Sequence, residues 1–402
     1  MAYSEVLKKV DHIVGTPDSF AALLSCKALK PFDDRVCSFL SDLSEMIMKD
    51  PQMRAFPDVM TFGFWIRRSS VAGMKERFER DFGDTICRGK GLVFHIAPSN
   101  VPMNFAYSLA AGLLMGNSNI VRIPSKDFPQ TGLTCSAIRR ALEKNEDIRP
   151  YIYLVKYGHD REVNDLFSSV CDERIIWGGD RTIEEIRLSP LLPRSQEITF
   201  ADRYSLAVID SDAYMGTSDK ERLAGDFYND TYLTDQNACT SPRIVIWIGD
   251  RVEEARSLFW KNLHDIVKEK YRFEAIQAVD KLDAVLNAGC DIDGLKLEEN
   301  EDNLIVRVRV SDIYEDIMDH ICHSGYFYEY ICEDILKIIP LCDDKRCQTI
   351  SYIGPKEMIT PLTESGVKGI DRVIPIGRTM DFELIWDGYD LRSQLTRIIK
   401  VE

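Results

Sequence analysis

A chain of 402 residues with 45% hydrophobic content can bury a large core and is long enough for about two or three domains. It carries 50 lysines and arginines against 65 aspartates and glutamates, a formal net charge of -15, and its basic residues cluster only in pairs such as Arg67-Arg68. A nucleic-acid surface needs a concentrated positive field, so this balance excludes nucleic-acid binding.

The first residues contain no apolar run between a basic flank and a cleavage site, so we expect no signal peptide. No apolar stretch approaches the ~20 residues that a transmembrane helix needs. The 11 cysteines are an odd number without paired C-x-x-C spacing, which argues against a zinc ribbon or a disulfide framework. We therefore expect a cytoplasmic protein whose thiols are mostly small buried hydrophobes.

The first predicted element is a helix near the N-terminus, which Asp33 or Asp34 can cap. Its apolar residues recur at helical spacing: Val36, Phe39, Leu40, Leu43 and Ile47. From residue 91, short apolar runs alternate with helical segments, and the runs 92–97, 119–123, 151–156, 174–177 and 205–209 predict buried strands. This alternation predicts βαβ units and a parallel, doubly wound sheet.

A second region is predicted from residue 211, with helices over 218–233 and 251–271 and strands over 243–248 and 304–310. A further strand is expected at 372–376, before the tail Trp386-Asp-Gly-Tyr-Asp390. No repeat or low-complexity linker separates these regions, so we expect interleaved domains. The predicted parts are 1–210, 211–370 and 371–402.

The loop 97–102 is the first candidate site, although no G-x-G-x-x-G or P-loop is present. It follows a predicted strand and precedes a helix that Pro102 begins and Gly116 ends. Ligands of open α/β sheets bind at such carboxyl ends of strands. Asn100 could donate a hydrogen bond to an oxyanion there, or it could cap the helix. His95, within the strand, is interpreted as a core residue.

The polar loop 235–242, between a predicted helix and a strand, is the second candidate site. It places Cys239 where a thiol can reach a ligand. A nucleophilic cysteine needs a lowered pKa, which a sequence does not report.

Together these segments resemble successive signatures of the aldehyde dehydrogenase superfamily. The matching segments are Ala97-Pro-Ser-Asn-Val-Pro102, Ala110-Ala-Gly, Asn119-Ile-Val-Arg-Ile-Pro-Ser-Lys126 and Gln236-Asn-Ala-Cys239-Thr-Ser-Pro. The loop 235–242 and the tail from Asp381-Phe-Glu to Asp390 are most similar to the long-chain acyl-CoA reductase family, which includes the fatty acid reductase of bacterial luminescence. The resemblance covers most of the chain from about residue 60.

The resemblance implies an aldehyde dehydrogenase-like α/β fold. Its doubly wound parallel-sheet cofactor domain (1–210) would be interleaved with a second α/β catalytic domain (211–370), followed by a C-terminal return or oligomerisation segment (371–402). It also implies that Cys239 is the nucleophile and that Asn100 forms an oxyanion hole with the Cys239 backbone N–H.

The resemblance further implies a nicotinamide cofactor. Arg122, Ser125 and Lys126 match the segment that touches the adenosine ribose, and Gly178 and Gly179 match a glycine turn near the pyrophosphate and nicotinamide. The position of Lys126 is often glutamate in the superfamily, and a lysine would attract a 2′-phosphate. We therefore expect NADPH, with NADH as the alternative.

One departure from the superfamily concerns the glutamate that activates water in hydrolytic members. The matching stretch is 196–205, where Thr199 takes that position and Glu197 lies two residues before it. Without a placed base, an acyl-enzyme thioester would resist water, which suits acyl exchange with another thiol or reduction. Whether Glu197 can act as a base is left open.

The predicted activity is the reduction of a long-chain acyl-CoA or acyl-protein thioester to the aldehyde through an acyl-cysteine. Alternatives are an acyl-phosphate reductase, an aldehyde dehydrogenase, a cofactor-free acyltransferase or thioesterase using Cys239 with His95, and a non-catalytic subunit. An acyl-protein synthetase or an acyl carrier would be the partner, and we expect a homo-oligomer.

Two other clusters are given structural interpretations. His320, Cys322 and His323 have suitable donor atoms but no fourth ligand at a recognisable spacing, so we expect no metal site. The aromatic run Tyr326-Phe-Tyr-Glu-Tyr330 is interpreted as core and subunit packing in preference to an acyl tunnel.

Overall fold

A computed structural model describes residues 3–299, 302–314 and 316–401. The chain forms two compact units. The first holds the residues up to Ala201 together with those from Tyr389 onward, and the second runs from Asp202 to Gly388. Among the described residues, no helix is both long and apolar enough to span a membrane.

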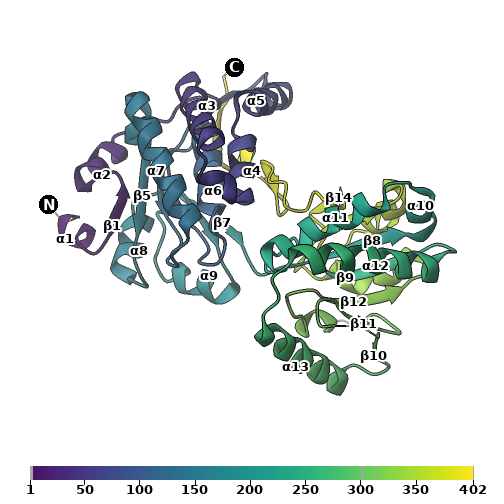
Figure 1. Cartoon of the computed structure of the whole chain (residues 1–402). Coiled ribbons are helices and arrows are strands. Elements are labelled where there is room, and N and C mark those ends of the chain that lie inside the picture. The colour runs from purple at the N-terminus through teal and green to yellow at the C-terminus, as the bar shows by residue number, and fades with distance from the viewer. Residues whose placement is uncertain (1–2, 300–301, 315, 402) are drawn as a thin grey trace. The chain divides into compact units, whose positions relative to one another are not determined.

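The first unit is built on a six-stranded sheet in the order β1-β5-β4-β3-β6-β7 (Figure 1). Five strands are parallel: β3 (Leu92–Ile96), β4 (Ser118–Arg122), β5 (Ile152–Lys156), β6 (Glu173–Trp177) and β7 (Gln196–Phe200). β1 (Asp11–Val14) runs antiparallel to β5. Strands β3, β4 and β6 are buried throughout, which explains their near-continuous apolar runs and confirms the predicted doubly wound sheet.

Helices cover both faces of this sheet. Its helices are α1 (Ser4–Leu7), α2 (Pro17–Leu24), α3 (Asp34–Lys49), α4 (Pro57–Trp65), α5 (Arg68–Phe82), α6 (Asn104–Leu114), α7 (Pro129–Lys144), α8 (Arg161–Ser168) and α9 (Asp180–Arg187). α2, α8 and α9 share a core with the side chains of Phe94, Ile96 and Ile120, whereas α6 packs on β3 and β4 and α3 packs on α6 and α7. α3 is the predicted N-terminal helix, and the Asp33 carboxylate caps it by accepting from Arg35 N.

His95 confirms its interpretation as a core residue. Its ring is fully buried between Ser108 Oγ on α6, at 2.7 Å, and Asn119 Oδ1 on β4, at 2.9 Å. Burial lowers its pKa to about 4, so the imidazole is neutral at physiological pH.

The second unit contains a seven-stranded sheet in the order β10-β11-β12-β9-β8-β13-β14 (Figure 1). The parallel strands are β8 (Tyr204–Asp210), β9 (Pro242–Ile248), β11 (Val306–Arg309), β12 (Tyr326–Ile331), β13 (Cys347–Ile353) and β14 (Arg372–Pro375), and β10 (Lys296–Leu297) is antiparallel. Its helices are α10 (Ser211–Gly216), α11 (Lys220–Thr231), α12 (Val252–Lys270), α13 (Ala275–Asp291), α14 (Ile339–Asp343) and α15 (Thr360–Glu364). α11 and α12 share one core with the sheet, and α13 contributes to the other.

The division of the chain differs from the predicted one. The strand at 205–209 was assigned to the first part, but β8 pairs with β9 and β13, so it belongs to the second sheet. The first unit therefore ends at Ala201 and not at 210, and β7 closes its sheet. Likewise, the predicted segment 371–402 is divided, because β14 pairs with β13 while residues from Tyr389 onward belong to the first unit.

The chain returns to the first unit after the turn at Asp387 and Gly388. β15 (Ile385–Trp386) precedes this turn, and β16 (Tyr389–Asp390), α16 (Leu391–Gln394) and β17 (Thr396–Ile399) follow it. β17 pairs antiparallel with β2 (Ile86–Gly89), and Asn117 Nδ2 donates to Leu395 O at 2.9 Å. The first unit is thus assembled from two distant parts of the chain.

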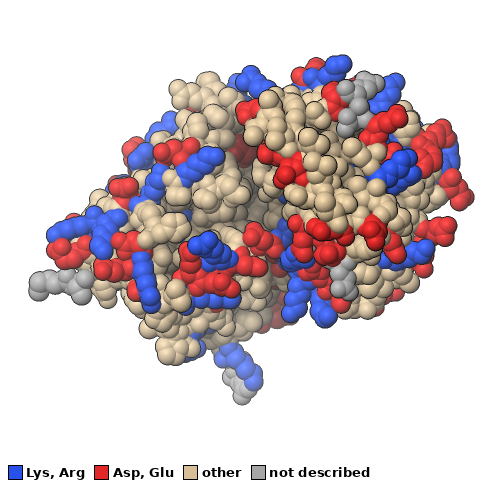
Figure 2. All heavy atoms as spheres, turned by 90° about the horizontal axis from the view of Figure 1, so that it is seen from below, with Lys and Arg blue, Asp and Glu red and all other residues tan. Residues whose placement is uncertain are grey.

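Charged side chains of both signs are interspersed on the face shown in Figure 2. Lysines, arginines and carboxylates also form ion pairs at the surface, for example Lys9 with Glu162 and Arg346 with Asp319. Such exposed pairs contribute little to stability.

Candidate active site

The loop between α11 and β9 carries Cys239, and a buried glutamine fixes its shape. Gln236 has a positive φ of 58°, and its side chain is fully buried. Its Nε2 donates to the carbonyls of Pro242 and Tyr326, both at 3.0 Å, and its Oε1 accepts from the N–H groups of Gly325 and Tyr326. The glutamine of this motif therefore ties the loop to β9 and β12.

Cys239 itself is half-buried. Its carbonyl accepts from Ser205 Oγ at 2.8 Å, and its Sγ accepts from Nε2 of Gln348, the second residue of β13, at 3.5 Å. Burial and the negative charge of Asp387 raise the pKa of the thiol to about 11, although the Gln348 hydrogen bond and Arg203 act against them. The sulfur in this arrangement is a protonated thiol at neutral pH.

Asp387 lies at the turn where the chain leaves the second unit. Both residues of the turn have positive φ values, 50° for Asp387 and 74° for Gly388, a backbone that Asp-Gly pairs favour. The carboxylate is 6% exposed and accepts from Gln348 Nε2. Burial raises its pKa to about 6, against the effects of Arg203 and Gln348.

Gln348 and Asp387 were not among the predicted site residues. Asp387 stands in the tail Trp386-Asp-Gly-Tyr-Asp390, which carried the family resemblance, so a signal for it was present. Gln348 had none, because β13 mixes buried polar side chains with apolar ones and gives no apolar run.

Asn100, the other predicted catalytic residue, lies in the loop between β3 and α6 of the first unit. Its side chain is exposed. α6 begins at Asn104, Met103 occupies the N-cap position, and no side chain caps the helix. The alternative that Asn100 is the helix cap is therefore wrong. The predicted helix end is confirmed, since Gly116 follows with a φ of 86°.

The predicted ribose-contacting residues lie at the carboxyl end of β4, with Arg122 as its last residue and Ser125 and Lys126 in the loop that follows. Arg122 stacks over the Tyr157 ring at 4.7 Å and donates to Gly158 O at 3.1 Å, so part of its guanidinium is already engaged. Ser125 and Lys126 are exposed, with the Lys126 ammonium 5.4 Å from the Phe128 ring centre.

The predicted glycine turn lies between β6 and α9. Gly178 N donates to Phe200 O at 3.1 Å, and Gly179 is the N-cap of α9 without a side-chain cap. Beside it, the Trp177 ring stacks on Phe200 with 3.6 Å between centres. The uncapped helix N-terminus offers free N–H groups to an anion.

These donors fit a dinucleotide. In the order β5-β4-β3-β6-β7, the chain winds outward in both directions from β3, so the carboxyl ends of β3 and β6 flank a topological switch point. Dinucleotides bind at that place in open α/β sheets. The β4 loop with Lys126, the loop with Asn100 and the turn at Gly178 and Gly179 all follow carboxyl ends of these strands.

Glu197, whose capacity to act as a base was left open, lies at the opposite edge. It is near the amino end of β7, and its carboxylate accepts from Arg174 Nε and Arg187 Nε, each at 2.8 Å. Thr199, at the position of the hydrolytic glutamate, pairs with Ile176 inside the sheet.

The remaining candidates are structural. The described residues contain no cluster of three or more histidine, cysteine or carboxylate side chains that could hold a metal ion. His323 Nδ1 lies 3.2 Å from Arg243 Nη1 and 3.3 Å from Gln236 O. Tyr326, Tyr328 and Tyr330 are buried in the core of the second unit, in agreement with the core interpretation.

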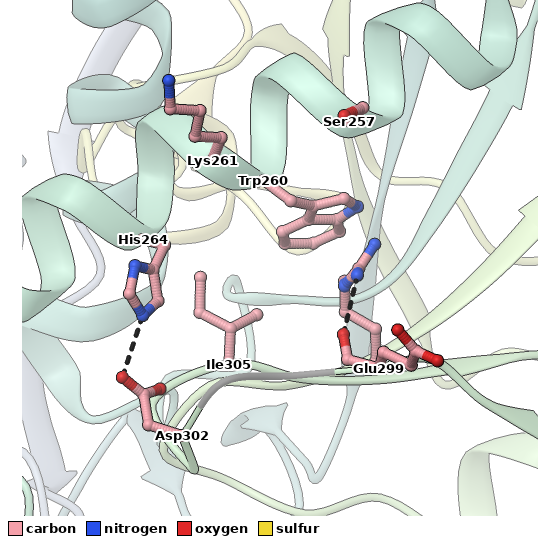
Figure 3. Close-up of a pocket in the computed structure, with 8 residues that line it drawn as sticks. Ser257, Trp260, Lys261, His264, Glu299, Asp302 and Ile305 are labelled. Atoms are coloured by element: carbon pink, nitrogen blue, oxygen red, sulfur yellow. Dashed lines mark hydrogen bonds and ion pairs between the residues drawn. The ribbon is translucent and has the colours of Figure 1, made fainter.

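A pocket of about 230 Å³ opens beside α12 in the second unit (Figure 3). Trp260, Lys261 and His264 line it from the helix, and Asp302 lies opposite them (Figure 3). Arg307 also lines the pocket. His264 pairs with Asp302 at 2.9 Å, and Arg307 donates to Glu299 O at 3.3 Å. No cysteine lines it, so Cys239 remains the candidate nucleophile.

Residues 71–273, half of the chain, match the family described as acyl-CoA reductase (LuxC). The chain belongs to this family. The acyl-CoA reductase (LuxC) match includes the Asn100 and Cys239 loops.

Two curated relatives are both named long-chain acyl-protein thioester reductase. The protein of Vibrio harveyi is 26% identical over 323 residues, and that of Aliivibrio fischeri is 24% identical over 327 residues. Each alignment covers 77% of this chain and 63% of the relative, so the chain spans less than two thirds of the length of these relatives.

Solved structures of aldehyde dehydrogenases share the fold. An NAD-dependent benzaldehyde dehydrogenase from Corynebacterium glutamicum aligns with a TM-score of 0.63 and 14% identity, over 96% of this chain and 89% of its own. An oxidoreductase from Marinobacter aquaeolei aligns with a TM-score of 0.66 and 12% identity, over 95% and 89%. The expected aldehyde dehydrogenase-like α/β fold of this acyl-CoA reductase (LuxC) family member is thereby confirmed.

Proposed function

We propose that this protein reduces a long-chain acyl thioester to the aldehyde, with Cys239 as the nucleophile and NADPH as the reductant. The observation that carries the proposal is the environment of the Cys239 sulfur. It lies half-buried in a loop pinned by Gln236, and it accepts a hydrogen bond from Gln348. Membership of the acyl-CoA reductase (LuxC) family supports the reaction class.

The first step transfers the acyl group. The Cys239 sulfur attacks the carbonyl carbon of the donor, and the oxygen of the tetrahedral intermediate accepts hydrogen bonds from the Asn100 amide and the Cys239 N–H. When the intermediate collapses, the bond to the donor sulfur breaks. The proton of the Cys239 thiol passes to the departing thiolate, which leaves as a free thiol.

The second step releases the aldehyde. A bound nicotinamide would supply the hydride for the carbonyl carbon of the acyl-cysteine. Asn100 then holds the oxygen of the thiohemiacetal anion. The carbon–sulfur bond to Cys239 breaks, this oxygen becomes the aldehyde carbonyl, and the sulfur, which leaves as a thiolate, regains a proton from solvent. The proposed anchors for the cofactor are Lys126 at the ribose and Gly178 with Gly179 at the pyrophosphate.

The donor is a thioester on coenzyme A or on a protein. The second form is suggested by the name of the relatives from Vibrio harveyi and Aliivibrio fischeri. A cofactor-free thioesterase using His95 with Cys239 is disfavoured, because His95 is fully buried and both of its ring nitrogens are hydrogen-bonded.

The test is to incubate the protein with a long-chain acyl-CoA and to follow intact mass without cofactor, then NADPH oxidation by absorbance. We expect one acyl adduct on wild type and no adduct on Cys239→Ser, together with loss of turnover. Cys290→Ser, at an exposed cysteine on α13, is the matched control and should behave as wild type. Turnover of Cys239→Ser within about tenfold of wild type would remove Cys239 from the reaction.

A further inference from the structure

The amide of Gln348 links Cys239 to Asp387. Its Nε2 atom donates to Cys239 Sγ at 3.5 Å and also to Asp387 Oδ1. The glutamine is fully buried and the aspartate is 6% exposed, so both sit beside the sulfur largely shielded from water. Since a primary amide nitrogen carries two hydrogens, one can face each partner.

The carboxylate decides which end of the amide faces the sulfur. An ionised carboxylate only accepts hydrogen bonds, so it selects the NH2 end of Gln348 and repels the carbonyl end. The carbonyl end of the amide has no hydrogen bond that would favour another orientation, because Gln348 Oε1 is buried and meets no donor within the described part of the chain. Asp387 is therefore the group that orients the amide.

Two arginines near the sulfur, Arg203 and Arg372, donate to other partners. Arg203 binds the Asp371 carboxylate and the carbonyls of Lys345 and Cys347. Arg372 donates to the carbonyls of Thr379 and Asp381 and lies over the Trp386 ring at 4.2 Å.

A third guanidinium, that of Arg243 on β9, donates from Nη1 to Cys322 O and contacts His323, and its buried Nε meets no acceptor in the described part of the chain. Within the described residues, Gln348 is thus the side chain whose N–H reaches the sulfur.

We propose that Asp387 and Gln348 form a positioning pair, in which Asp387 holds the Gln348 amide so that it presents an N–H donor to the Cys239 sulfur. This deepens the proposed function, because a donor stabilises the thiolate more than the thiol. The two members act in opposite directions on the sulfur: the N–H favours the thiolate, while the negative charge of Asp387 opposes it.

The pair also has a defined pH range. Burial raises the pKa of Asp387 to about 6, so its carboxylate is ionised and orients the amide above that pH. Below it, the protonated acid can itself donate to Gln348 Oε1, and the amide is free to turn its carbonyl toward the sulfur. The groups that bear on this titration are Arg203, Arg372 and Asp371 together with Gln348.

A double-mutant cycle separates orientation from charge. Gln348→Met keeps the length of the side chain without a donor, and Asp387→Asn removes the charge without changing the shape. The readout is the rate of iodoacetamide alkylation at Cys239, followed by peptide mass spectrometry from pH 6.5 to 10. Thr349→Val, at the neighbouring buried residue on β13, is the matched control, and its rate of Cys239 alkylation should equal that of wild type.

We expect Gln348→Met to slow alkylation at pH 7.5 by about fivefold or more, because a charge-assisted hydrogen bond is lost. In that background Asp387→Asn should speed alkylation, since only the charge remains to be removed. In the wild-type background, Asp387→Asn should raise the alkylation rate by a factor at least about threefold smaller than in the Gln348→Met background, or should lower the rate. The reason is that the orientation of the Gln348 amide is lost together with the charge.

Equal factors for Asp387→Asn in both backgrounds would overturn the proposal, and so would alkylation of Gln348→Met within about twofold of wild type. If the double variant does not fold, the single Gln348→Met result decides alone. The assay needs neither acyl donor nor cofactor, so its outcome is independent of whether the protein reduces thioesters.

Discussion

At Cys239, burial and reactivity oppose each other. The half-buried sulfur has a pKa raised to about 11, so little thiolate is present at neutral pH. Thiolates are the species that oxidants attack, and a protonated thiol resists them. In the proposed acyl transfer, the proton held by the Cys239 sulfur is available to the departing thiolate of the acyl donor.

Asn100 gives the clearest prediction for a single residue. In the proposed mechanism the Asn100 amide acts mainly when the oxyanion forms, so Asn100→Ala should lower kcat by about 10²–10³ with a smaller change in KM. Steady-state kinetics with a long-chain acyl-CoA measures this, and Ser99→Ala, the exposed neighbour in the same loop, should leave kcat unchanged. An Asn100→Ala variant with wild-type kcat would show that another group binds the oxyanion.

The residues that a sequence can assign here are those within one local motif. Asn100 and Cys239 each lie in a short loop, and the succession of these loops along the chain carried the family resemblance on which their predicted roles rest. Gln348 is 109 residues from Cys239 in sequence, and only the pairing of β13 with β8 brings it to the sulfur. No local pattern records such a long-range contact.

Strand β7 bears on whether water can hydrolyse the proposed acyl-cysteine. Its only described acid, Glu197, is bound by Arg174 and Arg187 near the amino end of the strand, away from the carboxyl ends where ligands bind. Both carboxylate oxygens of Glu197 are engaged by guanidiniums, so the side chain is not placed to activate a water molecule. The acyl-cysteine should therefore be long-lived in water.

We accordingly expect aldehyde to be oxidised only when an acceptor thiol such as coenzyme A is present. The measurement is NADP⁺ reduction with a long-chain aldehyde, with and without the thiol. Sustained formation of free fatty acid without thiol, lost in Glu197→Gln, would show that Glu197 activates water after all.

We expect the loop after β4 to set the preference between the two nicotinamide cofactors. Lys126 is exposed there, and the neighbouring Asp127 carboxylate is paired with Lys156 at 2.5 Å, which offsets its repulsion of a phosphate. The proposed charge-assisted contact from Lys126 to the 2′-phosphate would contribute ~1.5–3 kcal/mol, which corresponds to an expected preference for NADPH of roughly tenfold to hundredfold.

Comparison of kcat/KM for NADPH and NADH in wild type and Lys126→Glu tests this. The ratio should fall to or below unity in the variant. Lys144→Glu, at the exposed end of α7, is a control for net charge alone and should keep the wild-type ratio. An unchanged ratio in Lys126→Glu would place the phosphate elsewhere.

The type of an element could be predicted where its burial produces a run or a periodic pattern of apolar residues in the sequence. The strands with which it pairs could not be predicted. The strands over 92–97, 119–123 and 174–177 are buried on both faces and appear where expected. The run at 205–209 has the same appearance, yet it joins the other sheet, because its neighbours β9 and β13 are set by pairing over long distances.

At the scale of the whole molecule, the first unit depends on residues that follow the second unit in the chain. Leu391 and Leu395 are buried in it, and β17 adds a strand beside β2. Leu395→Ala should therefore destabilise the first unit by about 2–4 kcal/mol through the cavity that it leaves.

Hydrogen exchange measures this unit by unit. Exchange should accelerate across β2–β6 in Leu395→Ala and stay unchanged in the second unit. Ile398→Ala, at a 57% exposed position of β17, is the matched control and should change stability by less than about 0.5 kcal/mol. Faster exchange in both units alike would show that they unfold together.

The late return of the chain also constrains its synthesis on the ribosome. Asn117 is made 278 residues before Leu395, whose carbonyl its side chain binds. The second unit, which is continuous in sequence, is complete and free to fold while β2 still lacks its partner strand. Until β17 emerges, β2 presents an unpaired edge to other nascent chains. The newly made protein is thus most exposed to misassembly at the unit that was begun first.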